Sequence, residues 1–162
     1  MKLAERRAVR MIALQALYEL DCTEHPADHV IPERIRGYEA NSTEAEEPIS
    51  ADQRLMIYKL VNGVVSNRPR LDRVIQIYAA ERPLDEVAVI DRNILRMAIY
   101  EFAIDRETPV NAAINEAVEL AKEFGADSAS KFVNGVLGTI ARHENDVQTT
   151  LAEVPGSEES EP

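Results

Sequence analysis

Apolar residues recur at helical spacing along nearly the whole of this 162-residue chain. A spacing of three and four residues places side chains on one side of an α-helix, whereas a half-buried strand alternates every two residues. No segment keeps that alternation for long. The most apolar segment, residues 94–102, is hydrophobic on nearly every side, which is typical of a central helix. The pattern therefore predicts an all-α protein.

Capping residues, glycines and prolines mark where the helices begin and end. Ser50, with Gln53 three residues later, forms a capping-box pattern that opens one helix. Gly125 is placed to end another. The expected helices cover approximately residues 3–21, 27–36, 50–66, 69–83, 87–105, 113–124 and 128–143. About seven helices joined by short turns predict two small helical bundles packed together.

The acidic residues are unevenly distributed. Residues 38–52 and 144–162 carry 11 of the 29 acids and no Lys or Arg. The net charge of −11 therefore comes from these two segments, and the rest of the chain is close to neutral. We predict one domain over residues 1–143, with a flexible acidic loop at 37–49, followed by a disordered acidic tail at 144–162.

The sequence lacks the marks of several classes of protein. No apolar run of about 18 residues could span a bilayer and no signal peptide is recognisable, so we expect a cytoplasmic protein. Cys22 has no second cysteine to pair with. His25 and His29 are four residues apart, but Pro26 interrupts the helix that a metal site would need. With no glycine-rich phosphate loop or nucleophile motif, we expect no enzymatic activity, cofactor or metal.

Arg96 interrupts the apolar segment 94–102. A buried guanidinium needs an acidic partner, which Glu101 on the same helix or Glu116 on the next could supply. We predict a structural ion pair and name Glu116 as the partner of Arg96. A ligand-binding role for Arg96 is the alternative.

The start of the first helix is basic. Four basic residues and one acid lie in the first eleven positions: Lys2, Arg6, Arg7, Arg10 and Glu5. At about 100° per residue the three arginines fall on one arc beside the apolar stripe. Because the helix macrodipole disfavours cations at this end, the cluster indicates selection for an anion such as RNA. A solubilising cluster is the alternative.

Phe132 lies one position away from the apolar stripe of the last expected helix, next to Lys131. Single-stranded RNA is commonly read by aromatic stacking combined with cationic contacts. The pair is therefore a candidate RNA contact, with a position at the edge of the core as the alternative for Phe132.

Four segments together resemble the NusB family of bacterial transcription antitermination factors. They stand in the family's order: Arg6-Arg7-Ala8-Val9-Arg10 followed by 13–18, Asp91-Arg92-Asn93-Ile94-Leu95-Arg96 within 91–101, Ala113-Ile114-Asn115-Glu116-Ala117 within 113–122, and Lys131-Phe132-Val133-Asn134-Gly135-Val136-Leu137. The segments that begin at Ile114 and at Phe132 are the most specific.

The resemblance implies two small helical subdomains and no catalytic activity. Family members bind the boxA element of ribosomal RNA leader transcripts, a single-stranded RNA, together with NusE, a ribosomal protein, and help RNA polymerase read through termination sites. Some members self-associate, so a homodimer is possible. By motif position the RNA-binding residues would be Lys2, Arg6, Arg7, Arg10, Lys131 and Phe132, and the residues facing NusE would be Tyr18 and Asp91.

The chain also departs from the family pattern. The acidic loop and tail look like additions, and Arg82 stands where many relatives carry a tryptophan. Two other readings stay open. One is an RNA-targeting domain like those of ribosomal RNA cytosine methyltransferases, which the lack of a Rossmann-type segment disfavours. The other is a helical adaptor or homodimer that does not itself bind RNA.

Overall fold

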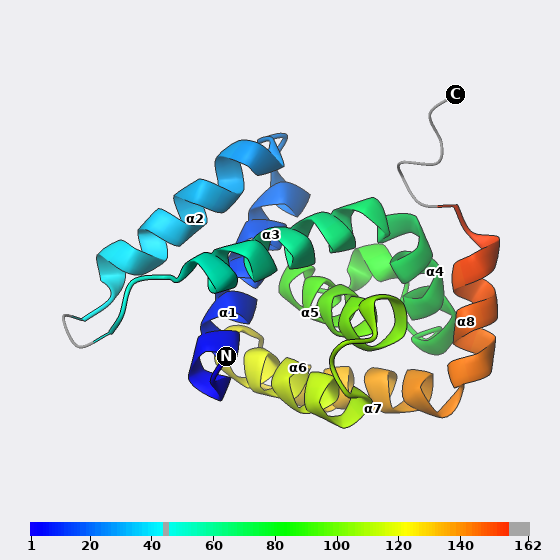
Figure 1. Ribbon diagram of the computed structural model, residues 1–162. Helices are drawn as coiled ribbons and strands as arrows, with labels where there is room; N and C mark the ends of the chain where they lie inside the picture. The colour runs from blue at the N-terminus through cyan, green and yellow to red at the C-terminus, as the bar shows by residue number, and fades with distance from the viewer. Residues whose placement is uncertain (44–45, 156–162) are drawn as a thin grey trace. The chain divides into compact units, whose positions relative to one another are not determined.

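A computed structural model of the protein describes residues 1–43 and 46–155, and every regular element in these ranges is helical (Figure 1). The prediction of an all-α protein is confirmed. The structure divides into two compact units, Met1–Asn62 and Gly63–Pro162, in agreement with two small helical bundles. The described residues contain eight α-helices rather than the seven expected.

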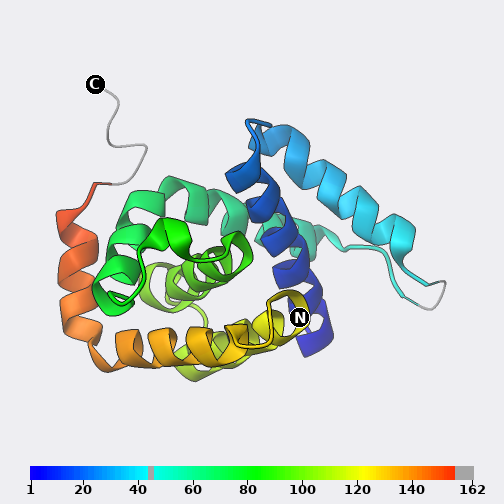
Figure 2. The ribbon, with the colours of Figure 1, turned by 180° about the vertical axis from the view of Figure 1, so that it is seen from behind.

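The first unit consists of α1 (Leu3–Cys22), α2 (Ala27–Asn41) and most of α3 (Ala51–Ser66), up to Asn62. α1 and α2 pack along one another (Figures 1 and 2). Their buried apolar residues recur at helical spacing: Val9, Ile12, Ala13, Ala16 and Leu17 in α1, and Val30, Ile31 and Ile35 in α2. The predicted capping box of α3 is present, because Ser50 N–H donates to Gln53 Oε1 (2.9 Å) and Gln53 N–H donates to Ser50 Oγ (3.1 Å).

α2 is longer than the sequence indicated. It continues to Asn41, so the prediction of a loop from residue 37 is wrong for residues 37–41. Ile31, Ile35 and Tyr38 follow each other at spacings of four and three residues, the first two buried and Tyr38 half-buried. This buried side holds the helix in spite of the acidic composition around it. Residues 44 and 45 of the predicted loop lie outside the described residues.

The second unit contains α4 (Arg68–Tyr78), η1 (Leu84–Glu86), α5 (Val89–Ile99), η2 (Tyr100–Asp105), α6 (Val110–Phe124), α7 (Ala129–Arg142) and α8 (Glu144–Glu153). α5 contacts α4, α6 and α7, which makes it the central helix of this unit, as predicted. It continues without a break into η2, a π-helical segment. α6 and α7 pack side by side (Figure 2).

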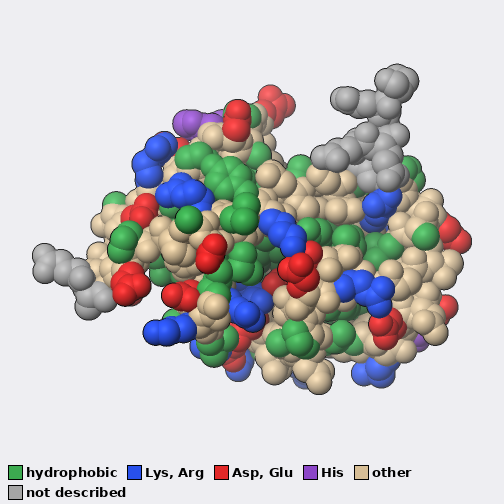
Figure 3. All heavy atoms as spheres, viewed as in Figure 1, with side chains coloured by type: hydrophobic (Ala, Val, Ile, Leu, Met, Phe, Trp, Pro, Cys, Tyr) green, Lys and Arg blue, Asp and Glu red, His purple; other side chains and the backbone are tan. Residues whose placement is uncertain are grey.

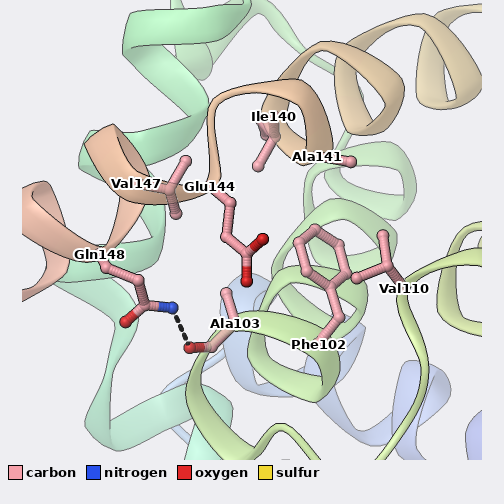
Figure 4. A pocket seen from close by; sticks show the side chains of 8 residues that line it. All are labelled: Phe102, Ala103, Val110, Ile140, Ala141, Glu144, Val147 and Gln148. Carbon is pink, nitrogen blue, oxygen red and sulfur yellow. Dashed lines mark hydrogen bonds between the residues drawn. The ribbon is translucent and has the colours of Figure 1, made fainter.

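Residues 144–153 form α8, so the prediction of a disordered tail is wrong for this part of the chain. Val147 and Leu151, four residues apart, are buried, and Gln148 Nε2 donates to the carbonyl of Ala103 in η2 (2.8 Å; Figure 4). Arg70 Nε donates to the carbonyl of Val154, just after the helix. Two apolar residues among polar ones gave too weak a periodicity to predict this helix. Residues 156–162 lie outside the described residues.

Arg96 is buried on α5, and its guanidinium is held by the carboxylate of Asp72 on α4 and by the side-chain oxygen of Asn93. Neither residue was among the partners predicted for Arg96, and Asn93 had been singled out only within the segment that resembles the NusB family. Apolar periodicity shows that position 96 faces the core but not which neighbouring helix lies opposite it. The predicted pairing of Arg96 with Glu116 stays a prediction.

Candidate nucleic-acid interface

Three of the predicted RNA-binding residues are exposed at the start of α1: Lys2 at its N-cap, and Arg6 and Arg7 in its first two turns. The one acid in the first turn, Glu5, is engaged by the helix itself, because its carboxylate accepts the backbone N–H of Lys2 (2.7 Å). That contact satisfies one of the unpaired donors at the helix start. The exposed charged side chains at this end of α1 are therefore basic.

Arg10 differs from Arg6 and Arg7, because its side chain is only 5% exposed. The prediction that all three arginines lie on an arc beside the apolar stripe is therefore wrong for Arg10, which is buried. Arg10 precedes the buried Leu14 and Leu17 by four and seven residues, a spacing that places it on their side of the helix. The apolar side of α1 is wider than the stripe seen in the sequence.

Tyr18, predicted to face a protein partner, is 44% exposed on α1. It follows Arg7 by eleven residues, or about three helical turns, and so lies on the same side of the helix. An exposed tyrosine offers apolar area together with a hydroxyl, a combination common at protein interfaces. The geometry of Tyr18 is compatible with the predicted role.

Lys131 and Phe132 lie in the first turn of α7, where Lys131 is exposed and Phe132 is half-buried. The guanidinium carbon of Arg82 lies over the Phe132 ring, 4.9 Å from its centroid. This is within the range of a cation–π contact. In the sequence Arg82 stands out only as a departure from the family pattern, because no local signal shows that positions 82 and 132 meet.

Asp91, in the first turn of α5, is only 7% exposed. Its Oδ1 is buried and has no hydrogen-bond partner among the described residues, and it lies 3.1 Å from the position that a Cβ at Gly125 would take. Burial raises the pKa of the Asp91 carboxyl, and the positive charge of Arg82 partly offsets the rise. Arg82 thus contacts Phe132 and acts through its charge on Asp91, both within the second unit.

The surface shown in Figure 3 carries Lys and Arg side chains interspersed with Asp and Glu, without one large basic area. On this face the cations therefore form only small local groups (Figure 3). Within residues 1–43 and 46–155, no three His, Cys, Asp or Glu side chains are placed to hold a metal ion. None of the described helices is long and apolar enough to cross a membrane.

A small hollow in the second unit is lined mainly by apolar side chains of η2, α7 and α8, among them Phe102, Ile140 and Val147 (Figure 4). Its volume of about 20 Å³ leaves room for roughly one water molecule and not for a nucleotide. On α7 it reaches Ile140, about two turns beyond Phe132. The hollow is therefore separate from the Lys131 and Phe132 surface.

The model of the NusB family matches residues 7–142 of this chain. This match runs from the basic start of α1 to the end of α7 and spans more than half of the chain. The chain belongs to the NusB family. α8 lies beyond the matched residues.

Named relatives agree with this assignment over most of their length. The transcription antitermination protein NusB of Chloroflexus aggregans is 42% identical over 158 residues, which cover 96% of this chain and 95% of that protein. The protein of the same name from Roseiflexus castenholzii is 44% identical over 137 residues, covering 83% and 90% respectively.

Solved structures show the same fold. T. maritima NusB superposes with a TM-score of 0.74 at 26% identity, covering 92% of this chain and 97% of that one. A chain from the crystal structure of the antitermination factors NusB and NusE in complex with dsRNA gives a TM-score of 0.74 at 24% identity, covering 88% and 99%. The NusB fold thus accounts for both helical units.

Proposed function

We propose that this chain is a transcription antitermination factor that binds the boxA element of ribosomal RNA leader transcripts together with NusE, and so supports processive transcription of ribosomal RNA operons. The observation that carries the proposal is the exposed basic start of α1 in a chain of the NusB family. Its relatives carry the name of antitermination proteins, and one solved NusB is in complex with NusE and RNA. Such a factor would act in the cytoplasm, without catalysis or a cofactor, in a complex with RNA polymerase.

In this proposal the exposed Lys2, Arg6 and Arg7 contact phosphates, while Lys131 and Phe132 add a cation and a stacking surface. Phosphate contacts supply affinity that falls with salt, and stacking supplies contacts to bases. Arg10 belongs to the same group by its position in the motif. Because it is buried, we assign it to holding the start of α1 in place for Arg6 and Arg7.

We further propose that Tyr18 and Asp91 contact NusE. The exposure of Tyr18 supports this role directly. Asp91 exposes little of its side chain, so its contribution would be confined to the small part of the carboxyl that reaches the surface.

A gel-shift titration on single-stranded boxA RNA, with and without NusE and at several salt concentrations, tests the function. We expect binding that weakens steeply with salt and is cooperative with NusE. The double substitution Arg6→Ala with Arg7→Ala should flatten the salt slope by about two phosphate contacts. Arg36→Ala with Arg54→Ala is the matched control, because it removes the same charge from exposed positions of the same unit.

Equal salt slopes for the two double variants would exclude α1 as the phosphate-binding element. Binding of NusE without any RNA binding by the parent chain would identify a protein-only adaptor instead. A homodimer in solution that binds neither RNA nor NusE would favour the self-associating alternative.

A further inference from the structure

The contact between Arg82 and Phe132 changes what the Lys131 and Phe132 surface can bind. Phe132 is half-buried, and the guanidinium of Arg82 lies over its ring. A base that approaches this ring along the same direction meets the guanidinium first. Because a guanidinium is planar and stacks on bases as well as on aromatic rings, it extends the stacking surface instead of blocking it.

The backbone that carries Arg82 is held in place by local hydrogen bonds. The N–H of Arg82 donates to the carbonyl of Ala79 (3.2 Å), which closes a turn after α4. Pro83 follows with its fixed φ, and its carbonyl accepts the N–H of Glu86 (3.0 Å). The side chain is thus presented from a defined turn, which lowers the entropy lost on binding.

The charges near Arg82 also favour this position. The positive charge of Arg82 acts on the carboxyl of Asp91 at the start of α5, where it partly offsets the rise in the pKa of Asp91, while Lys131 precedes Phe132 in the first turn of α7. Arg82 and Lys131 are both exposed; Arg82 lies over the Phe132 ring, and Lys131 precedes Phe132 in the same helical turn, so this surface combines two cations with one aromatic ring. Two cations beside a stacking platform suit a base together with its flanking phosphate.

We propose that Arg82 is an RNA-binding residue of this chain and that a nucleobase of single-stranded RNA stacks on its guanidinium, forming a layered contact of base, Arg82 and Phe132. This inference rests on the proposed function and adds to it a residue that is not among those carried over from the family motifs. The planar guanidinium, and not only its charge, is what the site requires.

The test uses the full chain and a boxA RNA in which single bases are replaced in turn by 2-aminopurine, whose fluorescence falls on stacking. The variants are Arg82→Gln, Arg82→Lys and Phe132→Leu. Arg73→Gln is the matched control, since it removes one exposed arginine from α4 in the same unit. Circular dichroism melting of each variant verifies that it is folded.

We expect the parent and Arg73→Gln to quench one labelled position strongly. Arg82→Gln and Arg82→Lys should both lose most of that quenching and bind about three- to tenfold more weakly. If Arg82→Lys quenches like the parent, or Arg82→Gln binds like Arg73→Gln, the stacking role of Arg82 is wrong. If Arg82→Gln is unaffected but Arg6→Ala with Arg7→Ala loses binding, the proposed function stands without this inference, whereas a parent that binds no RNA overturns both.

Discussion

Arg96 on α5 donates two hydrogen bonds to the carboxylate of Asp72 on α4, from Nε to Oδ1 at 2.7 Å and from Nη2 to Oδ2 at 3.0 Å. The side chain of Arg96 is 4% exposed and that of Asp72 is 23% exposed. Asn93 accepts a third hydrogen bond, from Nη1 (3.1 Å). A planar guanidinium paired with a carboxylate in this way fixes the register of two helices as well as joining them.

Asp72→Ala is expected to destabilise the protein by about 3 kcal/mol, because it leaves the buried guanidinium of Arg96 without its carboxylate. Glu119→Ala is the control, since it breaks the exposed ion pair with Lys122 (3.3 Å), which contributes about 0 to 1 kcal/mol. Urea denaturation measures both. Equal decreases in the free energy of unfolding for the two variants would mean that the pair of Arg96 and Asp72 stabilises the protein no more than an exposed ion pair does.

Gly63→Ala tests a close approach between α3 and η2. A Cβ at position 63 would lie 2.2 Å from Cζ of Tyr100, a rigid side chain that is 8% exposed. We expect the forced displacement to cost about 1 to 3 kcal/mol in the free energy of unfolding. Gly135→Ala, on α7 with nothing within 4 Å of its Cβ position, should instead stabilise the protein by about 0.5 to 1 kcal/mol. A stabilised Gly63→Ala would contradict the close approach.

The sequence predicted those parts of the fold that depend on neighbours in the chain. Ser50 and Gln53 are three residues apart and cap α3 as expected, and the apolar segment 94–102 runs through the central helix α5 into η2. Both signals are local, since capping and periodicity are completed within a few turns of one helix.

The contacts that the sequence did not predict join residues far apart in the chain. Asp72 pairs with Arg96, 24 positions later in the chain. Arg82, in the turn between α4 and η1, contacts Phe132 on α7. Nothing in the spacing of one helix shows which side chain of another helix lies opposite it. Arg6 and Arg7 lie outside the apolar stripe of α1, as predicted, and are exposed. The burial of Arg10 depends on contacts with other parts of the chain, which the periodicity of one helix does not show.

Leu151→Ala tests whether α8 stabilises the second unit. Leu151 is 7% exposed, and we expect its truncation to lower the free energy of unfolding by about 2 to 5 kcal/mol. Thr149→Ala, at an exposed position of the same helix, should change it by less than about 0.5 kcal/mol. Both are measured by urea denaturation followed by circular dichroism. Equal stability of the two variants would mean that residues 144–153 contribute no packing in solution.

Asp91→Asn should stabilise the protein at neutral pH, with a gain that disappears in acid. Burial raises the pKa of Asp91 in the folded chain, so the folded state holds its proton up to a higher pH than the unfolded state does. The stability contributed by this carboxyl is therefore fully present below the ordinary carboxyl pKa of about 4 and is lost as the pH rises through the folded pKa. Asn keeps the shape without that loss.

Urea denaturation of the parent and Asp91→Asn across the carboxyl titration range measures this difference. The advantage of the variant should grow as the pH rises and then level off above the folded pKa. Glu33→Gln gives a control of opposite sign, because a hydrogen bond from Arg36 and its charge lower the pKa of Glu33. The Glu33 carboxyl contributes stability that is present above its ordinary pKa and is lost as the pH falls. The free energy of unfolding of Glu33→Gln should therefore fall further below that of the parent as the pH rises. If the difference in the free energy of unfolding between Asp91→Asn and the parent does not change with pH, ionisation of the Asp91 carboxyl does not destabilise the folded state.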